Sequence, residues 1–452
     1  MARMFGTDGV RGIANADLTV ELAMKIGAAG AHVLASEVHN PRILVGRDTR
    51  RSGDMLSRAL AAGVCSVGGD VIDCGVLPTP ALAYLARLYG ADAAVMISAS
   101  HNTFEYNGIK WFSGEGYKLS DALEDEIEAI VRENRTLPRP LGEAVGHCLE
   151  AKRAAQEYEA FLISTATRRF EGRHVVLDCA NGSASRIARG VFEALGAKVS
   201  AYGDEPDGFN INDLCGSTHP ERLQELVTEL GGDAGFAFDG DADRVIAADE
   251  LGNIVDGDRI MGACARHLKE CGRLARNALV LTVMSNIGLK KRMAELGVDI
   301  EETAVGDRYV MERMREKGCA LGGEQSGHII FLDLNTTGDG ILTAIQVMNI
   351  LCEKNERMSR LAADVPIYPQ VLVNVLVEPE DKERALCDAE LLRRVDAAET
   401  ELADAGRVLV RASGTEPLIR IMLEGKSEAQ IDRLAVGIAR VLEEKYKGRI
   451  RQ

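Results

Sequence analysis

The stretch His174-Val175-Val176-Leu177-Asp178 is a short apolar run, and the loop Asn181-Gly182-Ser183 leads from it into a helical pattern over residues 184–195. A short run rich in β-branched residues predicts a buried strand, and the longer amphipathic run predicts a helix. The same order recurs at 42–66 and at 278–296. A strand, a loop and a helix in three successive stretches predict an α/β fold of parallel sheets covered by helices.

The C-terminal part of the chain follows a different pattern. Residues 371–377 alternate as a strand, the strands expected at 408–410 and 418–423 flank a polar loop, and a helix is expected over 428–447. This order is typical of a small α+β domain. The changes in pattern divide the 452 residues into four predicted domains: 1–150, 151–253, 254–366 and 367–452.

The charge of the chain excludes several classes of partner. Lys plus Arg number 53 and Asp plus Glu number 69, so the net charge is −16. An acidic protein is a poor candidate for binding nucleic acid or an anionic membrane, and an anionic ligand must be held by local basic loops. The sequence has no apolar stretch near the roughly 18 residues of a membrane helix and no apolar signal segment. The 10 cysteines are scattered without a CxxC pair, which predicts reduced thiols in a cytoplasmic protein.

A cluster of acidic residues follows an apolar run in the middle of the chain, in the segment Asp239-Gly240-Asp241-Ala242-Asp243-Arg244. Three carboxylates this close repel one another unless a cation compensates them, and hard oxygen ligands suit Mg²⁺ or Ca²⁺. Asp239, Asp241, Asp243 and Glu250 also occupy positions 1, 3, 5 and 12 of an EF-hand loop. However, Arg244 stands where the EF-hand turn requires glycine. We therefore predict a catalytic metal loop, with a solvated acidic turn as the other alternative.

A second polar loop, Ile97-Ser98-Ala99-Ser100-His101-Asn102, ends a predicted strand, and Lys110 follows shortly after it. A hydroxyl at the end of a buried strand is well placed to be a nucleophile, and His101 beside it suggests a Ser–His hydrolase. Adjacent residues on an extended loop usually point apart, however, and no GxSxG elbow surrounds Ser100. Taken alone, the loop favours a structural turn.

Two further polar loops lie between apolar runs. The glycine-rich segment 322–328 (Gly-Gly-Glu-Gln-Ser-Gly-His) has groups that can hydrogen-bond sugar hydroxyls, but it can equally be a turn. The segment 411–420 (Arg-Ala-Ser-Gly-Thr-Glu-Pro-Leu-Ile-Arg) has forked cations, hydroxyls and a glycine that lets backbone N–H groups face an anion. We predict a phosphate cradle there, with an ordinary hairpin loop as the alternative.

These four loops, in this order, resemble the α-D-phosphohexomutase superfamily. The opening Phe5–Gly12, the segment 207–216 (Asp-Gly-Phe-Asn-Ile-Asn-Asp-Leu-Cys-Gly) and the segment 305–309 (Val-Gly-Asp-Arg-Tyr) also match, the last of them in the branch that acts on amino sugars. The resemblance extends from residue 4 to about residue 447, and it reverses the interpretation of the Ser100 and Glu324 loops taken alone. Thr103 departs from the pattern, because proline is common there in the superfamily.

The resemblance implies four domains in a heart shape around one cleft, three with a mixed α/β core and a C-terminal α+β domain like the TATA-binding protein. It implies an isomerase that interconverts glucosamine 6-phosphate and glucosamine 1-phosphate through a phosphoserine and a 1,6-bisphosphate, for UDP-N-acetylglucosamine synthesis. The near alternative is a phosphomannomutase or phosphoglucomutase, and the distant one is a catalytically silent sugar-phosphate or Ca²⁺-binding protein. The implied partner is a small hexosamine phosphate, and a homodimer is a common assembly in the superfamily.

The resemblance also carries roles onto individual residues. Ser100 matches the phosphorylated serine and, through its phosphate, a metal ligand. The other matched residues are the Mg²⁺ ligands Asp239, Asp241 and Asp243; the basic residues Arg11, Lys110 and Arg244 beside the phosphoserine; Glu324, Ser326 and His328 on the sugar-reading loop; and Arg411, Ser413, Gly414, Thr415 and Arg420 on the phosphate cradle. Lys110 is the expected general acid or base, with its pKa lowered by the like charge of Arg11. The implied cofactors are one Mg²⁺ per chain and a glucosamine or glucose 1,6-bisphosphate primer.

Overall fold

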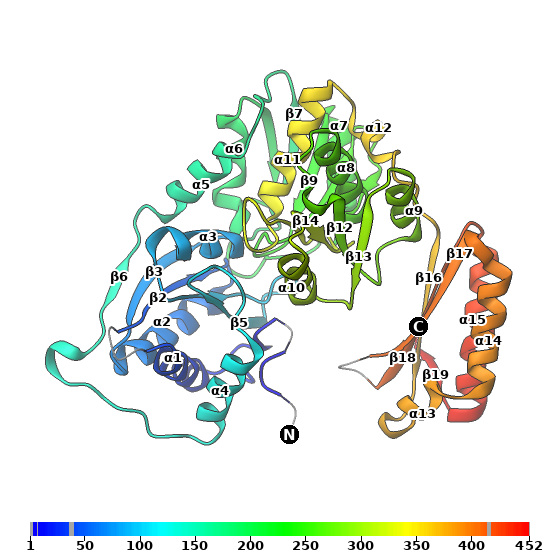
Figure 1. Cartoon of the computed structure of the whole chain (residues 1–452). Helices are drawn as coiled ribbons and strands as arrows, with labels where there is room; N and C mark the ends of the chain where they lie inside the picture. Colours follow the sequence, from blue (N-terminus) through cyan, green and yellow to red (C-terminus); the bar gives the residue numbers. More distant parts are fainter. Residues whose placement is uncertain (1–2, 7, 36–39, 414–416, 452) are drawn as a thin grey trace. The chain divides into compact units, whose positions relative to one another are not determined.

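The computed structural model describes residues 3–6, 8–35, 40–413 and 417–451. The chain divides into two compact units, one of residues 1–284 and 296–364 and the other of residues 285–295 and 365–452. Within the described residues the strands form four sheets, three in the first unit and one in the second (Figure 1).

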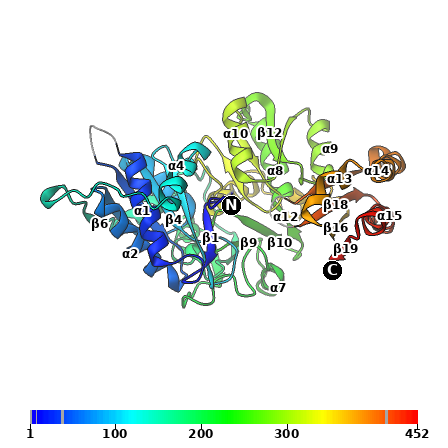
Figure 2. The same cartoon turned by 90° about the horizontal axis from the view of Figure 1, so that it is seen from below.

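The first sheet has the strand order β1-β5-β4-β2-β3-β6. Its strands are β1 (Val10–Ile13), β2 (Arg42–Arg47), β3 (Asp70–Val76), β4 (Ala93–Ile97), β5 (Tyr106–Ser113) and β6 (Cys148–Glu150). The associated helices are α1 (Val20–Leu34), α2 (Arg51–Ser66), α3 (Thr79–Tyr89) and α4 (Asp121–Arg132). Helices α1 and α2 lie side by side (Figure 2), and their apolar residues share one buried core with Val45, Val95 and Trp111 of the sheet.

The second sheet has the order β11-β10-β9-β7-β8. Its strands are β7 (His174–Asp178), β8 (Lys198–Tyr202), β9 (Ala234–Phe238), β10 (Val245–Asp249) and β11 (Ile254–Val255), with helices α5 (Ala154–Ser164), α6 (Ala188–Ala194) and α7 (Glu221–Leu230). The helix predicted over 184–195 is split into a 3₁₀ turn, Ser183–Arg186, and α6. The split falls at Ile187, whose φ of −119° departs from the α-helical value.

The third sheet has the order β13-β12-β14-β15. Its strands are β12 (Ala278–Thr282), β13 (Asp299–Thr303), β14 (Leu321–Gly323) and β15 (Ile329–Phe331), with helices α8 (Gly257–Glu270), α10 (Asp307–Lys317), α11 (Gly340–Lys354) and α12 (Met358–Ala362).

The three sheets share one repeat. In each, one inner strand (β2, β7 or β12) pairs in parallel with two neighbours, and a later strand (β5, β10 or β15) returns antiparallel to the strand that precedes it in the sequence. The parallel pairing predicted from the strand–loop–helix pattern therefore holds for part of each sheet, and the mixed α/β cores that the resemblance implied are confirmed. The returning strand follows its loop directly, without a crossover helix, and its residue pattern does not indicate its direction.

The second unit is the predicted α+β domain. Its antiparallel sheet has the order β17-β18-β16-β19, formed by β16 (Gln370–Leu376), β17 (Gly406–Ala412), β18 (Leu418–Gly425) and β19 (Arg449–Arg451). Its helices are α9 (Ile287–Glu295), α13 (Lys382–Leu386), α14 (Ala389–Leu402) and α15 (Glu428–Tyr446), and α14 and α15 lie side by side (Figure 1). Helix α9 is tied to this unit at its start, where Asn286 Nδ2 donates to the Tyr368 carbonyl (2.9 Å).

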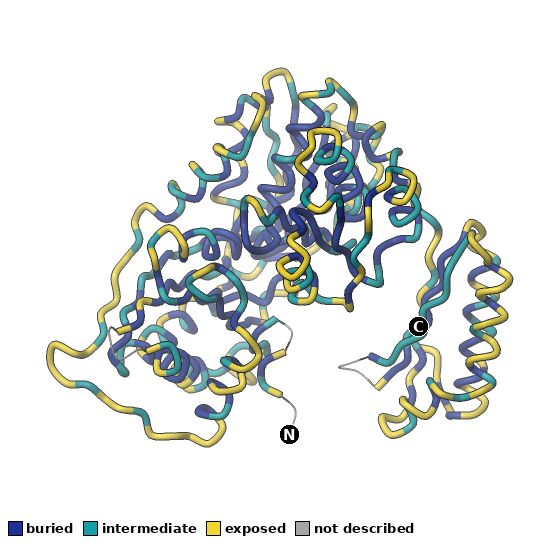
Figure 3. Tube along the Cα trace, viewed as in Figure 1, coloured by how far each residue is buried: buried dark blue, intermediate teal, exposed yellow. Residues whose placement is uncertain are grey.

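Burial follows this organisation. The central strands of the first unit are buried, whereas most residues of the connection 133–153, which includes β6, are exposed (Figure 3). Along the part of the chain that the structure describes, every helix is too short or too polar to cross a membrane.

Candidate active site

Three of the predicted functional loops occupy the same position in the repeat. Residues 98–105 join β4 to β5, residues 239–244 join β9 to β10, and residues 324–328 join β14 to β15. Each loop follows the carboxyl end of a strand, where ligands bind in open α/β sheets. The fold thereby explains why three polar loops far apart in the sequence contribute to one site in the first unit.

The backbone around Ser100 is held by an extensive network of hydrogen bonds. Ser100 is buried and has a φ of 53°, a conformation that is costly for residues other than glycine. Its N–H donates to the Ser98 hydroxyl (2.9 Å), and the Arg50 guanidinium donates to the carbonyls of Ser100 (2.9 Å) and Asn102 (2.8 Å). Asn212 Nδ2 donates to the same two carbonyls, at 2.9 Å each. The surroundings therefore compensate the cost of presenting this one serine.

Sequence reasoning missed the residues that hold this loop. Asp48 and Arg50 form a fully buried ion pair (2.9 Å), and Asp48 also accepts from the Ser98 hydroxyl (2.6 Å). Burial raises the pKa of Asp48, while the charge of Arg50 acts in the opposite direction. The available signal was the position of these residues in the polar loop directly after β2, at the same edge of the sheet as Ser100.

The three aspartates of the metal loop are brought together beside Ser100. All three are buried, and one carboxylate oxygen from each lies within 4.8 Å of the others. The Ser100 hydroxyl donates to Asp239 Oδ2 (2.6 Å). A Cβ atom at Gly240 would lie 2.6 Å from the Ser100 carbonyl oxygen, so this close approach of the two loops requires glycine. The loop joins two strands rather than two helices, which excludes the EF-hand alternative.

The electrostatics of the aspartates are those of a cation site. Burial, followed by repulsion from Asp243 and Asp241, raises the pKa of Asp239 well above its usual range. Burial acts the same way on Asp243, but the hydrogen bond and charge of His328, together with Lys110, lower its pKa. Asp241 Oδ1 and Asp243 Oδ1 have no hydrogen-bond partner among the described residues. Buried carboxylate oxygens without donors are suited to a hard divalent cation such as Mg²⁺.

Lys110 is tied to this cluster. Its Nζ lies 2.8 Å from Asp241 Oδ2 and 3.0 Å from Asp8 Oδ2, and its side chain is buried. Burial lowers the pKa of Lys110, but Asp241 and Asp8 outweigh that effect and raise it. Arg11 does lower this pKa, as predicted, but its effect is smaller than that of the carboxylates, so the expected net lowering is wrong. Arg11 itself pairs with Asp8. A lysine held charged can donate a proton or stabilise an anion, but it does not accept a proton near pH 7.

A series of charged and titratable side chains connects the first and third sheets, and three of them, Asp8, Lys118 and Asp307, were not predicted. Lys118 Nζ lies 2.6 Å from Asp8 Oδ1 and 2.6 Å from Asp307 Oδ2. The His328 ring follows, with Nε2 at 3.8 Å from Asp307 Oδ2 and Nδ1 at 3.6 Å from Asp243 Oδ2. Burial lowers the pKa of His328, but Asp243 and then Asp307 raise it overall. Asp8 and Asp307 fall in the motifs at 5–12 and 305–309, which is the signal that could have identified them.

A cavity of about 140 Å³ adjoins these charges, with Lys118, Asp307 and His328 in its lining. Arg308 and Thr337 also line it, together with the apolar side chains of Leu119, Met311 and Ile330.

The sugar-reading loop is more open than the metal loop. Glu324 is partly exposed and accepts from the Gly306 N–H (3.1 Å), and Ser326 is exposed. Gln325 Nε2 donates to Asp256 Oδ2 (3.3 Å), which favours a loop-orienting role for Gln325 over that of a solvent-facing spacer. His328, by contrast, is buried between two carboxylates, so the three predicted residues do not form one exposed surface.

The remaining basic residues surround His101. Arg244 Nη1 lies 3.0 Å from His101 Nδ1. The same His101 nitrogen lies 3.4 Å from Ser100 Oγ. Arg11 Nη1 donates weakly to the Ala99 carbonyl (3.5 Å). Burial, then Arg244 and Arg11, lower the pKa of His101 to about 4. The serine directs its hydroxyl at Asp239 and the histidine pairs with an arginine, so the geometry does not favour a Ser–His hydrolase.

The predicted phosphate cradle lies in the second unit. Arg411 on β17 is directly opposite Arg420 on β18, so the two arginines lie on the same face of the sheet. Burial and then Arg420 lower the pKa of Arg411. Lys382 Nζ donates to the carbonyl of the buried Ser413 (2.6 Å) and adds a cation that was not predicted. Gly414 and Thr415 lie outside the described residues.

Comparison with known families gives a consistent result along the whole chain. Four models described as phosphoglucomutase/phosphomannomutase match it: alpha/beta/alpha domain I at residues 2–137, alpha/beta/alpha domain II at 155–252, alpha/beta/alpha domain III at 256–368, and the C-terminal domain at 372–441.

Individual proteins are similar over the same length. A phosphoglucosamine mutase of Thermoanaerobacter sp. (strain X514) is 54% identical over 445 residues, 98% of this chain and 100% of that protein. A solved phosphoglucomutase/phosphomannomutase family protein from Burkholderia thailandensis has a TM-score of 0.83 at 26% identity, covering 100% of both chains. Aspergillus fumigatus N-acetylphosphoglucosamine mutase, solved with GlcNAc-6P and magnesium, has a TM-score of 0.70 at 18% identity over 99% of this chain and 96% of that one, a likeness of fold alone.

Proposed function

Because this chain belongs to the phosphoglucomutase/phosphomannomutase family, we propose that it is a phosphoglucosamine mutase, an isomerase that interconverts glucosamine 6-phosphate and glucosamine 1-phosphate. The family supports the α-D-phosphohexomutase architecture of four domains, and the 54% identity to a phosphoglucosamine mutase favours the amino sugar over glucose or mannose. The observation that carries the chemistry is the Ser100 hydroxyl, 2.6 Å from Asp239 in a buried cluster of three carboxylates. The glucosamine 1-phosphate formed would supply UDP-N-acetylglucosamine synthesis.

The proposed reaction runs in two transfers. With Ser100 phosphorylated, O1 of glucosamine 6-phosphate attacks the phosphorus, the P–Oγ bond breaks, and the proton lost from O1 is balanced by a proton gained at Ser100 Oγ, which becomes a hydroxyl. The 1,6-bisphosphate then reverses its orientation. The Ser100 hydroxyl attacks the phosphorus on O6, the P–O6 bond breaks, and the proton lost from Ser100 Oγ is balanced by a proton gained at O6, which becomes a hydroxyl. Glucosamine 1-phosphate leaves, and the phosphoserine is restored.

The described residues would support these transfers by charge. Asp239, Asp241 and Asp243 would hold Mg²⁺, which when bound supplies positive charge to the transferring phosphoryl group. Lys110 remains protonated between Asp241 and Asp8, so its proposed role is to stabilise negative charge or to donate a proton to a departing oxygen. Arg11 and Arg244 add cations beside the Ser100 loop. The initial phosphorylation of Ser100 would come from a glucosamine or glucose 1,6-bisphosphate primer.

Substrate recognition is assigned to two other loops. Glu324, Ser326 and the neighbouring His328 would read the sugar, and Glu324 has the charge that attracts a C2 ammonium. Arg411, Ser413, Gly414, Thr415 and Arg420 would hold the phosphate that is not being transferred. The same cradle must accept that phosphate in both orientations of the bisphosphate.

The remaining predictions concern the cellular compartment, the oligomeric state and the domain boundaries. All ten cysteines are free thiols in the structure, which supports the proposal of a reducing, cytoplasmic compartment. The homodimer and the predicted domain boundaries stay predictions.

Two measurements test the proposal together. Turnover of glucosamine, N-acetylglucosamine, glucose and mannose phosphates, assayed side by side with the bisphosphate primer, should be highest for glucosamine phosphate. Mass spectrometry of the primed enzyme should place one added phosphoryl group, about 80 Da, on the peptide that contains Ser100. Highest turnover with glucose or mannose phosphate would favour the phosphoglucomutase or phosphomannomutase alternative, and a phosphoryl group on another residue would contradict the mechanism.

A further inference from the structure

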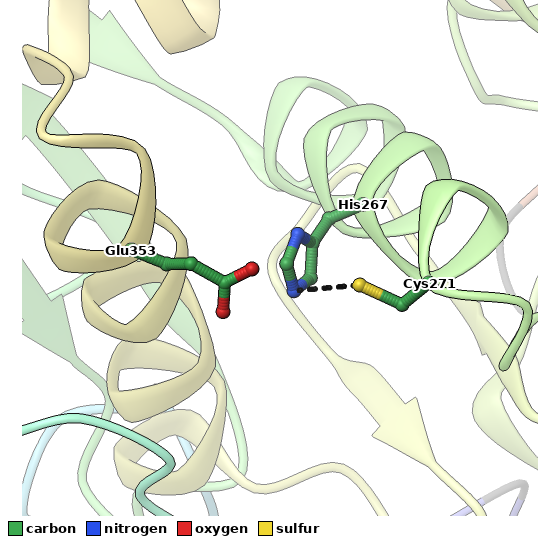
Figure 4. A group of neighbouring side chains, drawn as sticks. All are labelled: His267, Cys271 and Glu353. Carbon is green, nitrogen blue, oxygen red and sulfur yellow. Dashed lines mark hydrogen bonds between the residues drawn. The ribbon is translucent and has the colours of Figure 1, made fainter.

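A second group of metal-type ligands lies in the first unit, away from the aspartate loop. His267 is near the end of α8, Cys271 directly follows that helix, and Glu353 is near the end of α11 (Figure 4). Among the described residues, only this group and the aspartate loop bring three or more His, Cys, Asp or Glu ligand atoms within 4.8 Å of one another.

The spacing of two of these ligands matches that around a tetrahedral ion. His267 Nε2 and Cys271 Sγ are 3.7 Å apart, on residues four positions apart in sequence. Zinc–nitrogen bonds of about 2.0–2.1 Å and zinc–sulfur bonds of about 2.3 Å at a tetrahedral angle separate the two atoms by about 3.6 Å. Glu353 points its carboxylate toward the imidazole from the facing helix (Figure 4). A small movement of this side chain supplies the third ligand.

The surroundings of the three side chains favour a cation. His267 is only 6% exposed, and its Nε2, which faces the Cys271 thiol, is the ring nitrogen that would bind the ion. Cys271 and Glu353 are exposed, which leaves the group open to an ion from solution. The carbonyl end of α8 also attracts positive charge.

The competing partner of Glu353 is weak. Arg168 Nε lies 4.0 Å from the Glu353 carboxylate, and the Arg168 side chain is 57% exposed. A long ion pair between solvent-accessible groups contributes little free energy. It does not prevent Glu353 from turning to a bound ion.

We propose that His267, Cys271 and Glu353 form a second metal site, selective for a borderline divalent transition metal ion such as Zn²⁺. Imidazole and thiolate ligands select such ions, whereas the oxygen-only aspartate loop suits Mg²⁺. A water molecule completes the tetrahedron. The site does not depend on the proposed mutase activity.

The position of the site links it to the catalytic loops. Helix α8 begins at Gly257, whose N–H donates to the Gln325 carbonyl (3.0 Å) in the sugar-reading loop. Helix α11 begins at Gly340, whose N–H donates to the Ala242 carbonyl (3.0 Å) in the metal loop. The two helices pack on each other. An ion bound near the C-terminal ends of α8 and α11 therefore cross-links the two helices that begin at these loops. The cross-link stabilises this part of the fold.

Cobalt titration of the full chain tests the site, because Co²⁺ replaces Zn²⁺ and reports a thiolate ligand by an intense near-ultraviolet charge-transfer band. The titration is made with excess Mg²⁺ and a thiol-free reductant. One Co²⁺ per chain should give this band together with visible bands of tetrahedral cobalt, and Zn²⁺ should remove both. Bound Zn²⁺ should also raise the melting temperature of the chain.

Three variants decide the assignment. Cys271→Ser should abolish the charge-transfer band, and Glu353→Gln should weaken Co²⁺ affinity by about tenfold or more. Cys387→Ser, at an exposed cysteine of the second unit, is the matched control and should behave like the parent chain. Absence of the band in the parent chain, or an equal band in Cys271→Ser, overturns the proposal. Both substituted ligands are exposed, so the variants should fold, and unchanged affinity in Glu353→Gln would also contradict the three-ligand site.

Discussion

The loops at 239–244 and 324–328 occupy the same position in two copies of one repeat, yet their surroundings differ. In the first loop Asp239, Asp241 and Asp243 are buried and held by neighbouring charges. In the second loop Glu324 is partly exposed and Ser326 is exposed. Burial strengthens electrostatic interactions with a phosphoryl group, whereas exposure leaves a side chain free to meet a ligand. If the proposed function is correct, we expect the buried region to perform the chemistry common to all hexose phosphates and the open region to choose the sugar.

The largest expected effect lies in the buried region. Ser100→Ala removes the only atom that can carry the phosphoryl group in the proposed relay, so turnover should fall by on the order of 10⁴-fold or more for every hexose phosphate. Mutase assays with added bisphosphate measure this, and thermal melting serves as the folding control. Near-parental turnover would break the comparison, because the buried loop would then not contain the reacting group.

Asp241→Asn should have the next largest effect. It removes a buried charge that faces both the proposed cation and Lys110 (2.8 Å). Turnover should fall by about 10²–10³-fold, and the Mg²⁺ concentration needed for half-maximal rate should rise. The same loss is expected for glucosamine and glucose phosphates. An unchanged rate and unchanged sensitivity to chelation would mean that the metal binds elsewhere.

Thr79→Val tests how far the surroundings of the metal loop matter. The Thr79 hydroxyl donates to Asp241 Oδ2 (2.6 Å), and valine keeps the shape of the side chain without the donor. Loss of such an orienting partner typically costs 10–100-fold in metal affinity. We therefore expect the Mg²⁺ affinity of the variant to fall by about tenfold, with little change in KM for the sugar phosphate. A change in sugar KM alone would contradict this role.

Much of this site could be predicted from the sequence, because its residues follow apolar strands in short recognisable loops. The contacts between those loops could not. Lys110 and Asp241 are 131 residues apart, and only the packing of two sheets brings them together. The raised pKa of Lys110 depends on Asp241 and Asp8 together, so reasoning from the neighbouring positive charge of Arg11 led to the wrong direction. Likewise, Asp48 and Arg50 belong to no recognised motif. Their role depends on the contacts that they make with the 98–105 loop in the folded chain.

A buried aspartate whose partners among the described residues are all backbone groups contrasts with those of the metal loop. Asp178, at the end of β7, accepts from two backbone N–H groups, and burial raises its pKa to about 6. Because the folded chain binds this proton more tightly than the unfolded chain, stability should decrease as pH rises from about 4 to 6. Urea unfolding of Asp178→Asn should lose this part of the pH dependence. An identical pH dependence in the variant and the parent would contradict the raised pKa.

If the open loop chooses the sugar, Glu324→Gln should change the preference between glucosamine phosphate and glucose phosphate. The substitution removes the charge and keeps the shape, so the kcat/KM ratio of glucosamine phosphate to glucose phosphate should fall several-fold, while kcat/KM for glucose phosphate changes little. Ser326→Ala, which removes a neutral group from the same loop, is the matched control and should leave that ratio near the parental value. An equal loss for both sugars in Glu324→Gln would contradict the account, because the loop would then recognise only groups that the two sugars share.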